Sequence, residues 1–234
     1  MATTESPGLT IVIPAWNERD NLESLLPSLK EILVRLPAPW EIVVVDGGST
    51  DGTPEAARRH GARVIPQTER GYGGALLAGF AAAQSPYLVT MDADLSHPPL
   101  FLEEFWKRRD EAELLIASRY VPGGKAQMSR FRWLLSLILN RTYSLLLSVP
   151  VRDLSSGFRL YHRSALLALK PVARDFDFLE EVLVRLYCRG GRVSEIPFHY
   201  MPRGTGRSHA RLIKFGWAFL RTLVRMWRLR HGGA

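Results

Sequence analysis

The chain of 234 residues lacks several features that would each point to a particular class of protein. Its single cysteine, Cys188, excludes an internal disulfide and is typical of a reducing compartment. No apolar run approaches the roughly 20 residues that a membrane-spanning helix needs, and residues 1–8 carry neither the basic nor the apolar segment of a signal peptide. We therefore expect one large domain, or one domain with an appendage, in a reducing compartment.

Acidic residues are absent from two long stretches. No Asp or Glu follows Glu195, where the chain has eight basic residues, and none lies between Leu114 and Arg152, where it has six. The eight residues of the tail account for the whole excess of 31 basic over 23 acidic residues. This asymmetry predicts an anionic partner, which could be nucleic acid, a phosphoester or a membrane surface.

Short apolar runs alternate with segments of helical periodicity over the first 120 residues. We expect strands at 9–14, 40–46, 63–66, 87–91 and 113–118, and helices at 21–36, 53–60, 73–84 and 100–110. Nearly continuous apolar strands that alternate with helices predict an α/β fold with a mostly parallel, doubly wound sheet. In such sheets, ligands bind beyond the carboxyl ends of the strands.

Polar groups follow four of the expected strands. These groups are Pro14–Glu18, Asp46–Ser49, Asp92–Asp94 and Ser118–Arg119. Because the carboxyl ends of parallel strands meet at one edge of a sheet, we expect all four groups to share one rim. Their convergence is the main argument for a binding site.

Asp92 and Asp94 are two carboxylates one residue apart, directly behind the apolar run Tyr87–Met91. Like charges this close resist ionisation unless a cation sits between them. A hard divalent ion such as Mg²⁺ or Mn²⁺ takes oxygen ligands and commonly completes its shell with a ligand's phosphates. The alternative is an Asp- and Pro-rich turn at the end of a strand. For the nearby His97, the following Pro98 and Pro99 favour a structural role in a turn over a catalytic one.

The glycine-rich segment Arg70–Gly74 opens an expected helix. It could bind an anion at a helix N-terminus, or its glycines could serve close helix packing. It does not match the dinucleotide-binding pattern, because no Gly-X-Gly-X-X-Gly follows the first strand. At the end of the strand expected at 40–46, Asp46 could accept hydrogen bonds from a sugar hydroxyl or a base edge.

Several motifs in order resemble the family 2 inverting glycosyltransferases with the GT-A fold, and especially the dolichol-phosphate (polyprenyl-phosphate) mannosyltransferases. The resemblance covers roughly residues 9 to 211. The segments that carry it are Pro14–Glu18, Asp46–Thr53, Gly71–Ala75, Asp92–Pro99, Ser118–Gly124, Asp153–Arg159, Phe178–Glu180, Glu195–Phe198 and Arg203–His209.

This resemblance implies a role for each matching residue. It places the nucleoside along one end of the rim, at Pro14, Ala15, Trp16 and Glu18, with its base and ribose at Val44 and Asp46. It assigns ribose, metal and diphosphate to Asp92, Ala93 and Asp94, with Ser96 as a further metal ligand. It assigns phosphate contacts to Arg119, Arg203 and His209. Asp92, Asp94 and Arg119 are then the catalytic residues, and the cofactor is Mg²⁺ or Mn²⁺. Three residues differ from those common in that family. Gly47 replaces an acid, so the donor base stays open; Ser96 replaces a metal-binding Gln; and His209 replaces a Lys, which would make its phosphate contact pH-dependent near neutrality.

Two segments near the C-terminal end predict contact with a membrane surface. Residues 128–150 form a candidate interfacial helix in which Ser136, Asn140, Ser144 and Ser148 make one polar stripe, and a packed core helix is the equal alternative. Residues 212–234 predict a basic amphipathic helix with Trp and Phe on its apolar face. A helix docked on the body is the alternative for this second segment. We place the catalytic domain at residues 1–211.

The sequence thus predicts an inverting glycosyltransferase at the cytosolic face of a membrane, either peripheral or held by a membrane partner such as a small anchoring subunit. It would move a sugar, mannose from GDP-mannose by preference, from a nucleotide diphosphate sugar to a polyprenyl phosphate. Another sugar nucleotide or a non-lipid acceptor is the alternative. A basic nucleic-acid-binding domain is a distant third, because no recognition motif is present and four rim loops would have no role.

Overall fold

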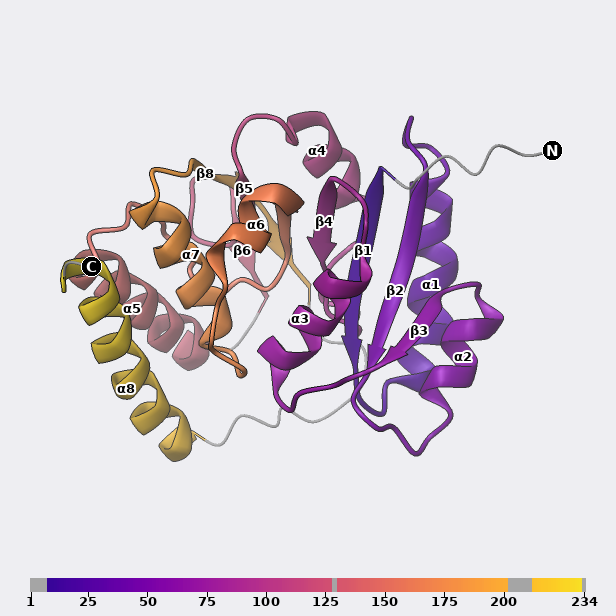
Figure 1. Ribbon diagram of the computed structural model, residues 1–234, viewed down its shortest axis with the longest axis horizontal. Helices are drawn as coiled ribbons and strands as arrows, with labels where there is room; N and C mark the ends of the chain where they lie inside the picture. The colour runs from indigo at the N-terminus through magenta and orange to yellow at the C-terminus, as the bar shows by residue number, and fades with distance from the viewer. Residues whose placement is uncertain (1–7, 128–129, 202–211, 233–234) are drawn as a thin grey trace.

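The computed structural model describes residues 8–127, 130–201 and 212–232, and its centre is a seven-stranded sheet (Figure 1). The strands run in the spatial order β3-β2-β1-β4-β7-β5-β8. Their bounds are β1 Leu9–Ala15, β2 Trp40–Asp46, β3 Arg63–Pro66, β4 Tyr87–Thr90, β5 Leu114–Ser118, β7 Arg159–His162 and β8 Val193–Pro197. Strand β7 pairs antiparallel with both of its neighbours, while the other pairs are parallel.

Helices cover both faces of this sheet. Their bounds are α1 Arg19–Leu33, α2 Thr53–Arg59, α3 Tyr72–Ala82, α4 Phe101–Arg108, α5 Arg130–Leu146, α6 Arg163–Leu169, α7 Phe178–Cys188 and α8 Leu212–His231. One core joins α1 and α4 to the sheet through residues such as Leu25 and Phe105. A second core joins α3, α5, α7 and α8 through Phe80, Val182 and Met226. The predicted doubly wound, mostly parallel α/β sheet is confirmed.

Strand β7 was not predicted, and it decides how the rim is built. Its four residues lie between β4 and β5, with Thr90 opposite Arg159. Because β7 runs antiparallel, it begins at the edge where β4 and β5 end. The segment before it, residues 153–158, therefore joins the rim. The fully buried guanidinium of Arg159 anchors this segment by donating to the carbonyl oxygens of Ser156, Leu154 and Leu179.

A small second sheet lies beside the first. It pairs β6, Lys125–Ala126, with β9, His199–Tyr200, in parallel. The backbone N–H of Lys125 and that of Phe198 extend the connection to the main sheet by donating to Phe198 and Ser118 respectively. The segment after β5 is thereby held against the segment after β8.

Helix α5 presents its apolar residues to the outside. Asn140 is buried and bonded to the body, while the side chains of Phe131, Leu134, Ile138 and Leu145 are 67, 51, 52 and 67% exposed. Of the predicted polar stripe, Asn140 is buried and Ser136 and Ser144 are partly buried, whereas Ser148 is exposed and follows the end of α5. The packed-core alternative does not describe the exposed apolar residues of this helix. Within the described ranges, no helix combines the length and the apolar character needed to cross a bilayer.

Helix α8 docks on α7 on the side of the molecule away from β3 (Figure 1). Leu223 and Met226 of α8 belong to the core, and Arg225 pairs with Asp177, directly before α7, and with Glu181 of α7. The alternative of a helix docked on the body therefore fits residues 220–231 of α8, the part whose side chains the structure describes. The same part leaves an apolar row exposed, formed by Leu220, Val224 and Trp227.

Candidate active site at the carboxyl edge of the sheet

The loops after β1 and β2 are clasped by hydrogen bonds from one to the other. The backbone N–H of Asn17 donates to Ser49 Oγ at 2.9 Å, and Asn17 Oδ1 accepts from the N–H of Thr50 at 2.9 Å. The N–H of Glu18 donates to Thr53 Oγ1 at 2.8 Å. Asn17 has a left-handed φ of 55°, which Asn tolerates better than most residues. The two loops therefore form one preformed wall at the end of β1.

The predicted nucleoside residues occupy different depths in this wall. The side chain of Trp16 is 54% exposed, whereas Val44 is wholly buried and Ala15 nearly so. Val44 thus supports the wall from the core, and its predicted place at the base and ribose stays a prediction. Pro14, the sixth residue of β1, is partly exposed. The carboxylate of Asp46 accepts from the N–H groups of Gly48 and Ser49, which fixes the loop after β2.

Asp94 lies beyond the end of β4 in a tight turn. Its Oδ1 accepts from the N–H of Ser96 at 3.1 Å and from the hydroxyl of Ser96 at 2.5 Å, while Leu95 between them is left-handed with a φ of 66°. Ser96 is fully buried. The structure therefore shows Ser96 as a residue that orients Asp94, while its predicted role as a metal ligand stays a prediction.

Asp92 is held by two side chains from other segments. Its N–H donates to Nδ1 of His97 at 3.0 Å, and the hydroxyl of Tyr72 donates to its Oδ1 at 3.2 Å. His97 is buried and stacked on Phe158, with ring centroids 4.7 Å apart, which fits the predicted structural role. Burial and the neighbouring Asp92 raise the pKa of Tyr72 well above its usual value, so its hydroxyl stays protonated.

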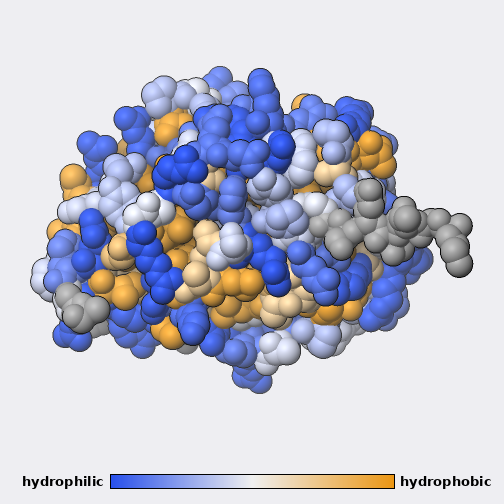
Figure 2. Space-filling model, turned by 45° about the horizontal axis from the view of Figure 1, so that its top comes forward, coloured by the Kyte–Doolittle hydropathy of each residue, from blue (hydrophilic) through white to orange (hydrophobic). Residues whose placement is uncertain are grey.

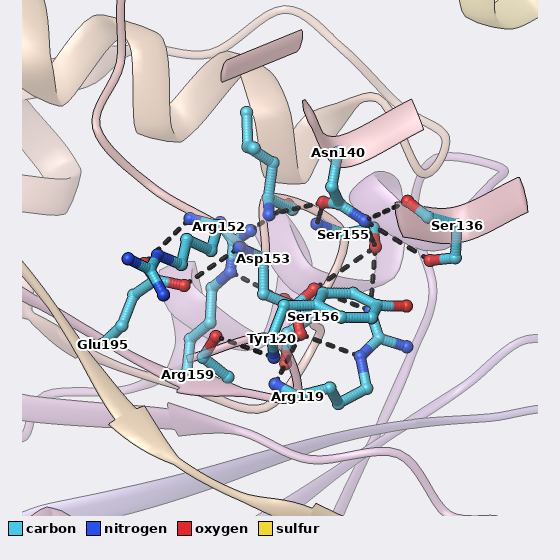
Figure 3. Close-up of polar contacts among 12 residues, drawn as sticks. Arg119, Tyr120, Ser136, Asn140, Arg152, Asp153, Ser155, Ser156, Arg159 and Glu195 are labelled. Carbon is cyan, nitrogen blue, oxygen red and sulfur yellow. Dashed lines mark hydrogen bonds and ion pairs between the residues drawn. The ribbon is translucent and has the colours of Figure 1, made fainter. Parts of the chain in front are cut away.

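Arg119 is locked into a buried ion pair (Figure 3). Its Nε donates to Asp153 Oδ2 at 2.8 Å, its Nη2 donates to Asp153 Oδ1 at 2.7 Å, and the same Nη2 donates to Ser155 Oγ at 2.8 Å. The side chain of Arg119 is 12% exposed and that of Asp153 fully buried. This geometry uses one edge of the guanidinium fork. The predicted phosphate contact would need the other edge, at Nη1.

Two further residues support this ion pair. Glu195 of β8 accepts from the N–H groups of Arg152 and Asp153 at 2.8 and 2.9 Å. Asn140 of α5 accepts from the N–H of Leu154 at 2.7 Å and donates to Ser155 Oγ at 3.2 Å (Figure 3). Burial raises the pKa of Glu195. Helix α5 is therefore bonded directly to the segment that holds Arg119.

Four residues of the site were not singled out by the sequence as site residues: Tyr72, Asn140, Asp153 and Glu195. Three of them lie in segments whose order resembles the family, and Asn140 lies in the polar stripe of α5. Their place in these segments was the signal that could have identified them, but it did not show which residue each of them contacts. Arg203 and His209 lie outside the described residues, so their predicted phosphate contacts stay predictions.

The acidic groups of the rim suit a divalent cation that shares its shell with a ligand. Asp92 and Asp94 provide hard carboxylate oxygens, and both are partly exposed at the same strand end. Among the residues that the structure describes, no group of three or more His, Cys, Asp or Glu could hold a metal by itself. Mg²⁺ is commonly bound through one or two carboxylates together with substrate phosphates. The donor set therefore fits Mg²⁺ or Mn²⁺ once a diphosphate is present.

Comparison with known proteins gives one consistent family. The model of glycosyl transferase family 2 matches residues 10–169. An uncharacterized glycosyltransferase of Mycobacterium tuberculosis is 32% identical over 200 residues, which cover 86% of this chain and 88% of the relative. A dolichyl-phosphate hexose transferase of Haloferax volcanii is 31% identical, with 83% of each chain covered. A dolichol-phosphate mannosyltransferase of Pyrococcus furiosus is 34% identical over 86% of this chain and 58% of the relative.

Solved structures resemble the fold over nearly the whole chain. Glucosyl-3-phosphoglycerate synthase of Mycobacterium tuberculosis, solved with Mn²⁺, UDP and glucosyl-3-phosphoglycerate, has a TM-score of 0.74 at 23% identity, over 97% of this chain and 81% of that chain. The same protein has also been solved with Mg²⁺ and UDP. This likeness confirms the predicted GT-A-like fold.

Proposed function

The chain belongs to glycosyl transferase family 2, and from that premise we propose that it transfers a sugar from a nucleotide diphosphate sugar to a polyprenyl phosphate at the cytosolic face of a membrane. Mannose from GDP-mannose is the donor that we favour, because one relative is named a dolichol-phosphate mannosyltransferase. The observation that carries the proposal is that α5, whose apolar side faces outward, is bonded through Asn140 to the segment that holds Arg119.

The proposed reaction is a displacement at the anomeric carbon. A phosphate oxygen of the acceptor forms a bond to that carbon from one face, while the bond to the donor's diphosphate breaks on the other face. The electron pair of the broken bond leaves with the nucleotide diphosphate, and the configuration at the carbon inverts. Because a phosphate acceptor is already anionic at neutral pH, the step needs no strong general base.

The rim residues would stabilise the charge that develops on the leaving group. Asp92 and Asp94 would hold the divalent metal, which neutralises the diphosphate when it is bound. Arg119 would present a fixed positive charge from a buried position, where a preorganised charge stabilises a transition state at little reorganisation cost. Trp16, exposed directly after β1, would contact the nucleoside.

Surface composition supports contact with an anionic membrane. Figure 2 shows hydrophobic residues among strongly hydrophilic ones on the face that it draws. On α8, the exposed apolar row Leu220, Val224 and Trp227 is interleaved along the helix with the exposed basic residues Arg221 and Arg228. Aromatic and aliphatic side chains next to arginines, with no acidic residue after Glu195, are typical of a helix that lies on anionic lipid.

Incubation with a panel of labelled sugar nucleotides tests the proposal. The protein, Mn²⁺ and vesicles of anionic phospholipid containing polyprenyl phosphate are mixed with one labelled donor at a time, and lipid-extractable label is counted. We expect one donor, GDP-mannose, to label the lipid, and the Asp94→Asn variant to lose that labelling. Label transferred to phosphoglycerate or another water-soluble acceptor, with none in the lipid, would replace the proposal by the soluble-acceptor alternative.

A further inference from the structure

The carboxylate of Asp92 has a neighbouring side chain at each of its oxygens, and the contact with Tyr72 is a hydrogen bond. Tyr72 donates to Oδ1 at 3.2 Å, and Nε2 of His97 lies 3.8 Å from Oδ2. Nδ1 of His97 also accepts from the N–H of Asp92, which leaves the neutral ring with its proton on Nε2, the nitrogen on the side of Oδ2. The side chain of Asp92 is therefore oriented before a ligand binds, whereas an aspartate without such contacts is free to rotate about its side-chain bonds.

The fold makes room for this contact and keeps Tyr72 in place. A Cβ atom at Gly157 would lie 2.6 Å from the hydroxyl oxygen of Tyr72, so only glycine permits the approach. The ring of Tyr72 stacks on that of Phe176, with centroids 4.8 Å apart and planes 12° apart. The neighbouring Gly73 lies so close to Phe178 that its Cβ would come within 2.7 Å of that side chain's Cβ.

We propose that Tyr72 is a positioning residue of the sugar transfer, whose hydroxyl orients the Asp92 carboxylate toward the metal-bound diphosphate donor. This inference rests on the proposed function, which assigns Asp92 to the donor. Tyr72 contacts Asp92 and acts on the donor only through it. A phenol suits this task because it donates a hydrogen bond without adding a positive charge that would compete with a metal ion.

The expected effect is on donor binding. A carboxylate that is already oriented loses less side-chain freedom when the donor binds, so preorganisation raises affinity without a new contact to the ligand. Removing the hydroxyl should therefore raise the KM for the donor, while the KM for the acceptor stays unchanged. A residue that only fills space would change thermal stability and leave both KM values alone.

The test combines Tyr72→Phe with Asp92→Ala. The first variant keeps the ring and its stack on Phe176 and removes only the hydroxyl. We expect it to weaken the binding of nucleotide diphosphate with Mn²⁺, measured by titration calorimetry, by about three- to tenfold, the usual size for the ordering of one side chain on binding. In the Asp92→Ala background the same change should have an effect below about twofold, because its partner is already gone.

Tyr87→Phe is the matched control, because the hydroxyl of Tyr87 also donates to an aspartate, Asp110, but far from the rim on the surface. It should leave nucleotide affinity unchanged. If Asp92→Ala weakens binding and Tyr72→Phe does not, the inference about Tyr72 fails and the proposed function stands. If Asp92→Ala itself has no effect on binding, the assignment of Asp92 to the donor fails. Equal losses from Tyr72→Phe in both backgrounds would show a packing role and overturn the inference.

Discussion

The two ends of the rim are held together by different kinds of interaction. On the side of β1, β2 and β4, short polar side chains such as Asn17 and Ser49 bond to backbone groups of neighbouring loops, and the carboxylates stay partly exposed. On the side of β5 and β7, the charges are buried and paired with one another, as in Arg119 and Asp153. The first side leaves its acids accessible to solvent. The second side fixes one arginine rigidly.

This difference predicts that the second side contributes more to stability. Arg119→Ala would leave the fully buried Asp153 without its cation, and removing one partner of a buried pair typically lowers the free energy of unfolding by about 3–5 kcal/mol. Urea unfolding measures this loss. Arg119→Lys should recover only part of it, because a point charge lacks the guanidinium fork.

Arg192→Ala is the control for Arg119. It removes an arginine from an ion pair with Glu113 in which the Arg192 side chain is 64% exposed. Exposed pairs contribute about 0–1 kcal/mol. If the two alanine variants unfold at the same urea concentration, the buried pair of Arg119 and Asp153 does not stabilise the side of the rim at β5 and β7.

The first side should contribute more to the chemistry than to stability. Asp94→Asn keeps the shape of the side chain and its bonds to Ser96 but removes a charge, so turnover should fall on the order of 10²-fold, the usual size of one lost electrostatic group in catalysis. Initial rates over a range of Mn²⁺ concentrations measure the change, with Asp110→Asn as a surface control. Turnover at the wild-type level with the wild-type Mn²⁺ dependence would remove Asp94 from the metal site.

The outward face of α5 should matter for lipid binding alone. Leu134→Ser combined with Ile138→Ser removes two half-exposed apolar side chains, and the exposed half of each contributes roughly 0.8–1.5 kcal/mol when it moves from water into lipid. Binding to anionic vesicles, measured by cosedimentation, should drop at least tenfold, while turnover with a detergent-solubilised acceptor is kept. Val34→Ser, which replaces a 68% exposed valine at the end of α1, is the matched control. Unchanged cosedimentation would move the lipid contact to α8.

The smallest expected effect concerns Glu180 on α7. Burial raises the pKa of this carboxyl from 4.5 to about 7, and its Oε2 is buried without a hydrogen-bond partner. The folded protein therefore binds a proton more tightly than the unfolded chain, and this contribution to stability is lost as the pH rises from about 4.5 through 7. Glu180→Gln should have a higher Tm than the wild type at pH 8, with a smaller difference at pH 5. Parallel Tm curves would contradict the raised pKa.

Local pattern was enough to predict most of the first half of the chain. The expected strand at 40–46 matches β2, and the helix expected at 53–60 matches α2 to within one residue. Asp46, Asp92 and Arg119 follow parallel strands, so their shared rim could be predicted from the position of each strand end. Helical periodicity and apolar runs are local properties, and a sequence displays them directly.

Only the tertiary structure decided which contacts these residues make. The pairing of Thr90 with Arg159 and the bond between Asn140 and Ser155 join segments that no sequence period relates. Arg119 looked accessible to phosphate in the sequence, but Asp153 covers one edge of its guanidinium. The sequence by itself determined the α/β class and the acids at the strand ends, because these follow from neighbouring residues. Long-range packing decides three other features: the place of β7 in the sheet, the inward orientation of Asn140 on α5, and the hydrogen bond from Tyr72 to Asp92. One sequence does not specify such packing residue by residue.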